Sequence, residues 1–283
     1  MKIGVSGASG NLGQEVLSAL RRQHTNVALV GITRTPSTVP APVEGREGDY
    51  DRPDLLVQAY RGIDRLLLIP SADLRPGVRG RQLKAAIDAA HYAGVPHVVL
   101  VSAAGTKEVT EPSLGAPYWE GEQHLIRTVS QWTILRMNYY AESMAEEIKS
   151  SFGSGILAGL GPERVAYVSR DDVAAAAAGI LIGEGHAGAI YNATGPATVT
   201  GEERAALVAK VTGAQVSFAP LSRDQLQGGL AQAGLPEEVV SAILEIKSNF
   251  VAGAFDIVTG DVERLAGHPP TSFQDVLSET LEA

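Results

Sequence analysis

The chain lacks cysteine, and it lacks long uninterrupted runs of apolar residues. Without cysteine, disulfides, thiolate nucleophiles and cysteine-ligated zinc are excluded. No stretch approaches the ~18 consecutive apolar residues that indicate a membrane span. Met1 leads directly into a strand-like apolar segment, which leaves no room for a signal peptide. We therefore expect a soluble, cytoplasmic protein with no membrane partner.

Positive charge is also scarce. The 283 residues include 23 Lys and Arg against 32 Asp and Glu, a net charge of −9 at pH 7. Binding to nucleic acid needs a basic face, so this balance argues against a nucleic-acid partner. None of the 6 histidines has the H-x-x-x-H or H-E-x-x-H spacing of metal ligands, so we expect no metal site.

Three glycines near the amino terminus form the most informative motif. Gly7, Gly10 and Gly13 stand in SGASGNLG, after the apolar residues 3–5 and before a helical pattern. In a strand–turn–helix, the first glycine permits the tight turn and the second lets a diphosphate approach the backbone. The third lets the helix pack on the sheet, and the helix amino end offers free N–H groups. The motif predicts a dinucleotide site; the alternative is a structural glycine turn.

Arg34 follows the second predicted strand, residues 26–32. An acidic residue at this point would bind a ribose 2′-hydroxyl and repel a 2′-phosphate, and none stands beside Arg34. A guanidinium can hold a phosphate through two hydrogen bonds and stack on adenine. We therefore predict NADPH as the cofactor; the alternative is a solvated surface arginine.

Strand and helix patterns alternate along the chain. Expected strands cover residues 65–70, 97–102, 132–136, 189–194 and 216–219. Expected helices cover residues 53–60, 78–93, 121–130, 171–182, 200–211, 223–233 and 237–250. The continuous apolar run at 65–70 fits a parallel strand covered on both faces. The rhythm predicts an α/β fold with a doubly wound parallel sheet and right-handed crossovers.

Several segments occur together in this chain: SGASGNLG, ITR, GDYD, LLLIPS and VVLVSAAG, followed by WTILRMNYYAES, YNATG and FDIVTGDVERLAGHPPTSF. The first five resemble the NmrA-like branch of the atypical short-chain dehydrogenases/reductases. The later three are similar to bacterial type 2 quinone oxidoreductases, to which triphenylmethane reductases are related. The resemblance covers nearly the whole chain.

This resemblance implies an NADPH-dependent oxidoreductase that transfers hydride to a quinone or a similar electron-poor acceptor. It implies a Rossmann-type NAD(P)-binding domain of residues 1–135, with contributions from about 165–195. A smaller α/β substrate-binding domain of residues 136–164 and 196–283 would complete a substrate cleft. The implied cofactor-binding residues are Gly7, Ser9, Gly10, Asn11, Leu12, Arg34, Asp49, Tyr50, Ile69, Pro70, Ser71 and Ser102. Asn138, Tyr139 and Tyr140 are implied to flank the nicotinamide and the acceptor as catalytic residues.

The chain departs from this pattern in one respect. Typical short-chain dehydrogenases place a lysine four residues after a tyrosine, where it lowers the tyrosine pKa, and none of the 8 tyrosines here has one. Gln123 stands where the similar quinone oxidoreductases have a lysine. Hydride transfer to a quinone needs no strong acid, because the hydroquinone anion can take a proton from water. A redox sensor that binds NADP(H) without catalysis is the alternative, whereas a nucleotide-sugar epimerase is disfavoured because its relatives use the Tyr–Lys pair.

Other candidates remain open on the sequence alone. Residues 118–120 form either an aromatic wall of the cleft or a helix start with a buried tryptophan. Phe250 and Phe255 line the cleft or, as apolar side chains usually do, pack in the core. Three glutamates within residues 142–147 are expected on a solvated helix face. The sequence does not decide the acceptor, or whether the protein is a homodimer.

Overall fold

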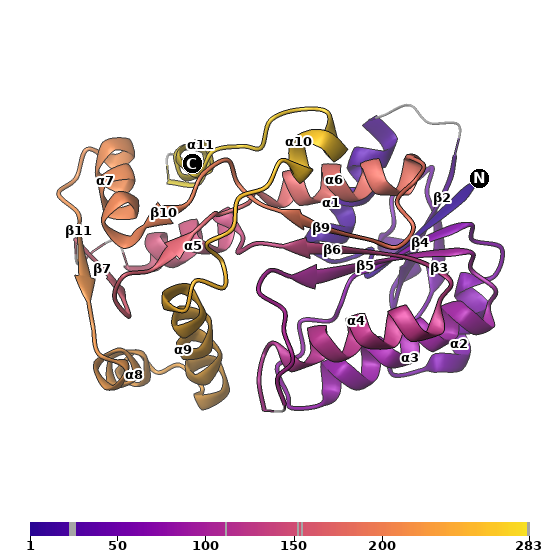
Figure 1. Ribbon diagram of the computed structural model, residues 1–283, viewed down its shortest axis with the longest axis horizontal. Helices are drawn as coiled ribbons and strands as arrows, with labels where there is room; N and C mark the ends of the chain where they lie inside the picture. Colours follow the sequence, from indigo (N-terminus) through magenta and orange to yellow (C-terminus); the bar gives the residue numbers. More distant parts are fainter. Residues whose placement is uncertain (23–26, 111, 152, 154, 282–283) are drawn as a thin grey trace.

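A parallel sheet of seven strands forms the larger half of the molecule (Figure 1). The structure, a computed structural model, describes all residues except 23–26, 111, 152, 154 and 282–283. The strands are β1 (Lys2–Ser6), β2 (Ala28–Thr33), β3 (Glu44–Glu47), β4 (Arg65–Leu68), β5 (His97–Ala103), β6 (Gln131–Met137) and β9 (Ala189–Ala193). Their order is β3-β2-β1-β4-β5-β6-β9. The chain therefore changes direction across the sheet between β1 and β4, which is where ligands bind in such folds.

Helices cover both faces of this sheet (Figure 1). One face carries α1 (Asn11–Arg22) and α6 (Arg170–Ile182), and the other carries α2 (Pro53–Tyr60), α3 (Val78–Tyr92) and α4 (Ala116–Thr128). Each layer encloses its own apolar core, so the strands are buried on both sides. This explains the continuous apolar runs that the sequence shows in β4 and β5. The predicted doubly wound α/β fold is confirmed.

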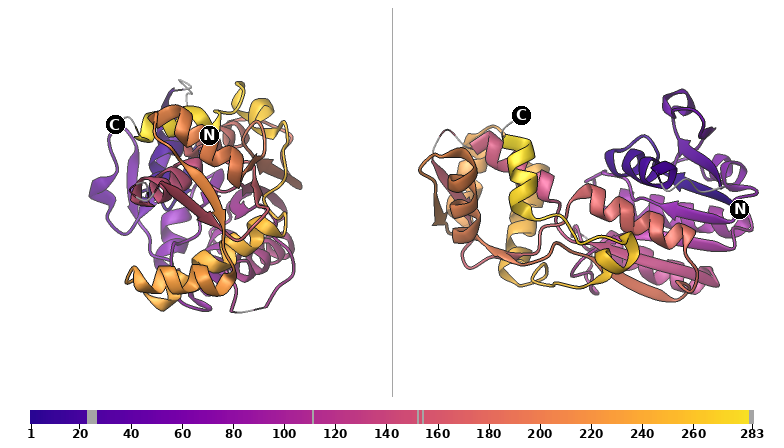
Figure 2. Two further views of the ribbon diagram at one scale, coloured as in Figure 1. Left: turned by 90° about the vertical axis from the view of Figure 1, so that its left-hand side faces the viewer. Right: turned by 90° about the horizontal axis from the view of Figure 1, so that it is seen from above.

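A smaller half lies beside the sheet (Figure 2). Its helices are α5 (Ala141–Ser151), α7 (Gly201–Thr212), α8 (Arg223–Gln232), α9 (Glu237–Val251) and α11 (Phe273–Leu281). It also holds β7 (Ile156–Gly159) paired with β11 (Ser217–Pro220), and β8 (Arg164–Val165) paired with β10 (Val199–Thr200). The short α10 (Asp261–Ala266) packs on α6, and a 3-10 turn, η1, spans Pro36–Thr38. A third apolar core, built around α5, Tyr167, Phe250 and Phe273, holds this half together.

Most of the helices and strands predicted from the sequence begin and end within a few residues of those in the structure. The helix predicted at 121–130 begins earlier, at Ala116, because Pro117 lies in its first turn, where its missing N–H needs no partner. The strand predicted at 65–70 ends at Leu68. Asn26, predicted to open the second strand, lies outside the described residues, and β2 runs from Ala28. The capping box expected at the start of the helix after residue 200 is present in α7.

Candidate cofactor and substrate site

The glycine turn after β1 has the shape that a diphosphate requires. Gly7 has φ +91°, a conformation that only glycine adopts without strain. A Cβ on Gly13 would lie 2.2 Å from the carbonyl oxygen of Gly7, so the third glycine permits the close packing of α1. A Cβ on Gly10 would have only the Gly7 oxygen nearby, at 3.4 Å, which leaves open space above the turn. With the free N–H groups of the first turn of α1, this cradle fits a dinucleotide diphosphate.

The end of β2 lies against the same turn. The hydroxyl of Thr33 donates a hydrogen bond of 2.9 Å to Oγ of Ser9. Arg34 follows and is exposed, and its side chain has neither an ion pair nor a hydrogen bond to any residue that the structure describes. An exposed guanidinium on the residue after Thr33, which contacts the turn, fits the 2′-phosphate contact predicted from the sequence. Ser9 and Asn11 are exposed at the turn, whereas the Leu12 side chain is buried in the core.

Tyr50 connects the loops that follow β3 and β4. Its hydroxyl donates a hydrogen bond of 2.8 Å to the backbone oxygen of Ile69. Burial raises the pKa of Tyr50 to about 12, so the phenol stays protonated and can keep donating. Ile69 and Pro70, both half-buried, therefore have a fixed place at the carboxyl end of β4.

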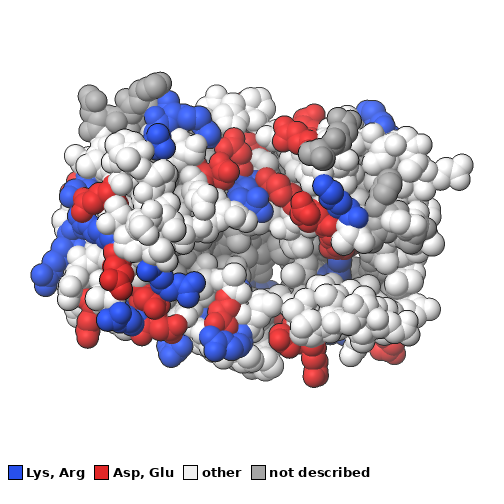
Figure 3. All heavy atoms as spheres, turned by 180° about the vertical axis from the view of Figure 1, so that it is seen from behind, with Lys and Arg blue, Asp and Glu red and all other residues white. Residues whose placement is uncertain are grey.

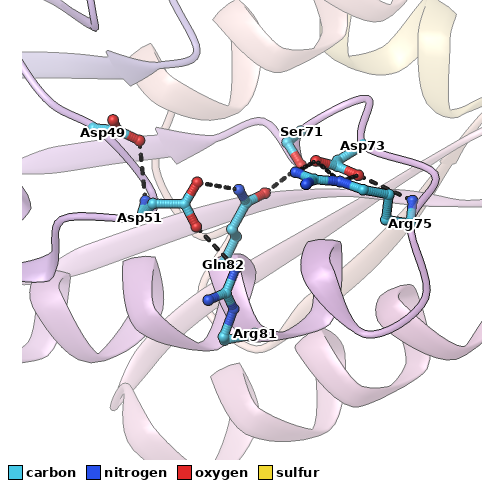
Figure 4. Close-up of polar contacts among 7 residues, drawn as sticks. All are labelled: Asp49, Asp51, Ser71, Asp73, Arg75, Arg81 and Gln82. Carbon is cyan, nitrogen blue, oxygen red and sulfur yellow. Dashed lines mark hydrogen bonds and ion pairs between the residues drawn. The ribbon is translucent and has the colours of Figure 1, made fainter.

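A chain of polar contacts extends this connection to α3 (Figure 4). Asp49 accepts a hydrogen bond of 3.0 Å from the backbone N–H of Asp51. Gln82 of α3 then donates to Asp51 at 3.0 Å and accepts from the Ser71 hydroxyl at 2.5 Å, while Arg81 pairs with Asp51 at 2.9 Å. Asp49 and Ser71, which the resemblance implies for cofactor binding, thus belong to one network that holds two loops of the sheet edge together.

Ser102 differs from the other implied cofactor residues. Its side chain is fully buried, and its hydroxyl donates a hydrogen bond of 2.6 Å to Glu122 on α4. Glu122 also accepts two hydrogen bonds from Arg136, at 2.9 and 2.6 Å, and these raise the pKa of the guanidinium. The Ser102 hydroxyl is therefore held inside the protein, and only the backbone of this residue remains for a ligand. Gln123, beside Glu122, is half-buried on the same helix.

A cavity of about 650 Å³ opens between the two halves at the carboxyl ends of β5 and β6. Its walls are the loop after β5, the first turn of α4, the residues after β6 and one side of α9. Figure 3 shows from behind that the surface is hollowed between the halves, with acidic and basic side chains interspersed rather than gathered. Asn138, Tyr139 and Tyr140, predicted together from the sequence, lie together in the lining.

The Asn138 amide has a positioning role in the structure. Its Nδ2 donates to the backbone oxygen of Phe255 at 3.1 Å, and its Oδ1 accepts from the backbone N–H of Tyr139 at 2.7 Å. The side chain is 2% exposed. Asn138 thereby fixes the chain after β6 to the segment after α9, and with it the floor of the cavity.

The two tyrosines have different surroundings. Tyr139 makes edge-on ring contacts with Tyr167, Phe250 and Phe255, at centroid distances of 5.1 to 6.4 Å, so it also belongs to the core of the smaller half. The ring of Tyr140 lies under the Arg170 guanidinium, 5.1 Å from its centroid. Burial raises the pKa of both tyrosines, so both phenols stay protonated at neutral pH.

The structure places the candidates that the sequence left open. Tyr118 lines the cavity from the start of α4 and Trp119 is half-buried, so each alternative for residues 118–120 holds in part. Phe255 lines the cavity, whereas Phe250 is a core residue. Arg79 also lines the cavity, and sequence reasoning missed it because three arginines occur within seven residues of that segment, residues 75–81.

The expectation of a solvated glutamate face on α5 is wrong for Glu142 and holds for Glu146 and, in part, for Glu147. Glu142 accepts a hydrogen bond of 2.7 Å from the backbone N–H of Arg170, and Glu147 pairs at 2.6 Å with Lys247, whose side chain is buried. Glu146 is exposed, and 40% of the Glu147 side chain is also exposed. Two of these carboxylates therefore have partners on α6 and α9, which are remote in sequence and which the helical spacing alone does not reveal.

Among the described residues, no group of His, Asp and Glu side chains is arranged to hold a metal ion. Within the same part of the chain, no helix is long and apolar enough to cross a membrane.

A family model described as NAD(P)H-binding matches residues 7–183, from the glycine turn to the end of α6. The chain belongs to this NAD(P)H-binding family. Quinone oxidoreductase 2 of Escherichia coli is 28% identical over 281 residues, which cover 98% of this chain and 97% of that protein. The resemblance inferred from the sequence motifs is therefore confirmed.

Two solved structures of the family extend the likeness to three dimensions. The NADPH complex of the NADPH-dependent quinone oxidoreductase from Escherichia coli has a TM-score of 0.92 at 28% identity, covering 99% of both chains. The NADP(H) complex of triphenylmethane reductase from Citrobacter sp. has a TM-score of 0.88 at 27% identity, covering 99% of this chain and 100% of that chain. Both halves of the molecule therefore have counterparts in NADP(H)-bound reductases.

Proposed function

We propose that this family member is an NADPH-dependent oxidoreductase that transfers hydride to a quinone or a similar electron-poor acceptor. The observation that carries the proposal is the position of the cavity. It opens at the carboxyl ends of β5 and β6, and the glycine turn lies at the carboxyl end of β1, so both occupy one edge of the same sheet. In open α/β sheets this edge binds the ligands, and a cofactor and an acceptor can therefore meet there.

The cofactor residues in this proposal are those at the glycine turn and along the sheet edge. The backbone at Gly7, Ser9, Gly10, Asn11 and Leu12 would hold the diphosphate, and Arg34 would hold the 2′-phosphate. Asp49 and Tyr50 would lie near the adenine, and Ile69, Pro70 and Ser71 near the ribose and the nicotinamide. Bound there, NADPH supplies the hydride.

The acceptor residues exclude water and orient the acceptor. Asn138 holds the cavity floor in place, and the ring of Tyr140 offers a flat aromatic surface against which a planar acceptor can pack. Because its pKa is raised, the Tyr140 phenol can donate a hydrogen bond to an acceptor oxygen but cannot act as a base. The hydroquinone anion formed by hydride transfer takes its proton from water, so the absence of a Tyr–Lys pair does not prevent the reaction.

The domain division proposed with this function follows the sheet. Residues 1–135, with about 165–195, would bind the cofactor, because they supply β1 to β5, most of β6, and β9. Residues 136–164 and 196–283 would bind the acceptor, because α9 and the segment after it form one wall of the cavity.

The test is NADPH oxidation by the purified protein with a panel of benzoquinones, naphthoquinones, dyes and aldehydes, followed by the decrease of nicotinamide absorbance. We expect oxidation well above the uncatalysed rate with at least one quinone or dye. If no acceptor accelerates oxidation while NADPH and NADP⁺ bind with clearly different affinities, the protein is a redox sensor and the enzyme proposal is wrong.

A further inference from the structure

The Arg79 side chain is buried in the cavity wall and forms no ion pair with any residue that the structure describes. It is only 9% exposed, lies in the first turn of α3 and lines the cavity. Its guanidinium lies over the ring of Tyr118, 5.5 Å from the centroid. It makes no ion pair or hydrogen bond with any described residue, and its Nε is buried with no partner. A buried charge in this state is costly, and proteins normally pair it.

Arg79 is the exception among the buried ionisable side chains that the structure describes. The others all have a hydrogen-bonded partner: Glu122 with Arg136, Glu163 with Arg204, Lys247 with Glu147, Asp172 with Thr271, and His97 with Thr133. The fold therefore pairs its buried charges generally. The unpaired guanidinium at the cavity is a feature of that site rather than of the protein's interior as a whole.

Two carboxylates that line pockets together with Arg79 already have partners. Glu245 of α9 lines the same cavity, and its Oε1 accepts from the Ser113 hydroxyl at 2.6 Å and from the Leu114 N–H at 2.9 Å. Asp73 is bound to Arg75, with Oδ2 at 2.6 Å from Nη2. The pKa of Asp73 is lowered first by Arg75 and also, through space, by Arg79. Neither carboxylate forms an ion pair or a hydrogen bond with Arg79, so the hydrogen-bonding groups of Arg79 remain available to a ligand.

Among the residues that the structure describes, the cavity lining carries more positive than negative charge, although the protein as a whole is negative. In that part of the chain Arg79 and Lys107 are the cationic residues of the lining and Glu245 is the acidic one, whereas the whole chain has a net charge of −9. Lys107 is exposed and likewise has no ion pair within the described part of the chain. The lining also contains aromatic side chains, Tyr118, Tyr140 and Phe255, which can pack against a planar ligand.

We propose that the cavity binds small planar acceptors that carry an anionic group, a carboxylate, sulfonate or phosphate, and that Arg79 binds this group. A guanidinium offers such an anion two parallel hydrogen bonds, and the Tyr118 ring packs against this guanidinium at 5.5 Å. The aromatic walls accommodate the planar part. The proposed function enters this inference only where the ligand is called an acceptor. The anion-binding site itself is inferred from the surroundings of Arg79 alone.

Binding without turnover tests this directly. The affinities of naphthalenesulfonate and of neutral naphthalenesulfonamide for the NADP⁺-loaded protein are measured by calorimetry. We expect the sulfonate to bind at least about ten-fold more tightly, and this preference to fall with added salt. Equal affinities of the two compounds for the wild-type protein overturn the proposal, whatever any variant does.

Variants then assign the preference to Arg79. In Arg79→Gln the preference for the sulfonate should vanish, and in Arg79→Lys it should be reduced. Arg127→Gln is the matched control, because Arg127 is exposed on α4 and has no ion pair among the described residues. NADP⁺ affinity should stay unchanged in all three variants. A parallel loss of NADP⁺ affinity in Arg79→Gln would make Arg79 a cofactor contact and overturn the assignment.

The two proposals fail separately. If quinones are reduced but sulfonate and sulfonamide bind equally, the anion site is wrong and the enzyme remains. If the sulfonate preference depends on Arg79 but no acceptor is reduced, the anion site holds and the proposed reaction is wrong. With an active enzyme, Arg79→Gln should raise KM for a sulfonated naphthoquinone about ten-fold or more and leave KM for the unsubstituted naphthoquinone unchanged.

Discussion

Replacing Arg34 by alanine should convert a preference for NADPH into near equality between NADPH and NADH. The side chain is exposed at the end of β2 and has no protein partner among the described residues, so its removal breaks no interaction within the fold. The change should therefore act on the ligand alone and leave the melting temperature close to that of the wild type.

The expected magnitude follows from the strength of a hydrogen bond between a guanidinium and a phosphate. A hydrogen bond to a charged group contributes about 1.5–3 kcal/mol, and an exposed site lies toward the lower end because water and salt screen it. About 1.5 kcal/mol corresponds to roughly ten-fold in affinity. We therefore expect Arg34→Ala to weaken NADPH binding about ten-fold and to leave the binding of NADH, which has no 2′-phosphate, nearly unchanged.

The assay is fluorescence titration of both cofactors with the wild type, with Arg34→Ala and with Arg61→Ala. Arg61 is the control, because it is exposed after α2 and precedes β4, at the opposite edge of the sheet from the glycine turn. Raised salt should narrow the NADPH preference of the wild type. Equal weakening of NADPH and NADH, or a similar effect of Arg61→Ala, would refute the placement of the 2′-phosphate at Arg34.

Three further changes test other parts of the structure. Gly10→Val should abolish binding of both cofactors while circular dichroism still reports a folded protein, and retained micromolar affinity would contradict the diphosphate cradle. Tyr140→Ala should raise KM for the acceptor and leave NADPH affinity unchanged. Tyr139→Ala should mainly lower the melting temperature, because Tyr139 packs in an aromatic core. If Tyr139→Ala raises KM and Tyr140→Ala lowers the melting temperature instead, the two assignments are wrong. Glu163→Ala should cost about 3–5 kcal/mol, because it leaves the buried Arg204 guanidinium without its carboxylate, 2.6 Å away. That corresponds to a melting temperature lower by about 6 °C or more, and combining it with Arg204→Met should recover part of the stability.

Local pattern predicts most strands and helices of the larger half and the glycine turn, although it misses β3, α10 and α11. The helix at Pro53–Tyr60 has the bounds that the sequence predicts, because a proline opens it and its apolar spacing is helical. The glycine turn is predictable because each glycine has a local reason, a positive φ at Gly7 and a close backbone contact at Gly13. Such features depend only on residues that are close together in the sequence, so a single sequence is enough to predict them.

Partners from distant segments are not predictable in the same way. Ser102 stands where a cofactor contact is expected, yet Glu122, 20 residues on, takes its hydroxyl. Within residues 75–81 the arginines look alike in sequence, and only the position of α4 decides that one of them, Arg79, is buried over Tyr118. Glu147 likewise gives no sign in the sequence that it pairs with Lys247, a buried residue of α9. Each of these depends on how two elements pack, which local periodicity does not contain.

The proposed division between a cofactor-binding half and an acceptor-binding half would allow one cofactor site to be combined with different acceptor cavities. The glycine turn and Arg34 belong wholly to the larger half, whereas the cavity is walled by both halves, with α9 and the segment around Phe255 supplied by the smaller one. Substitutions on α9 can therefore reshape the cavity without touching the diphosphate cradle. The relatives fit this reasoning, since a quinone oxidoreductase and a triphenylmethane reductase both match this chain along its full length. Arg79 and Tyr118 lie on the larger half, at α3 and α4, so the proposed anion site should persist when α9 varies, and acceptor shape and acceptor charge should be separable by mutation.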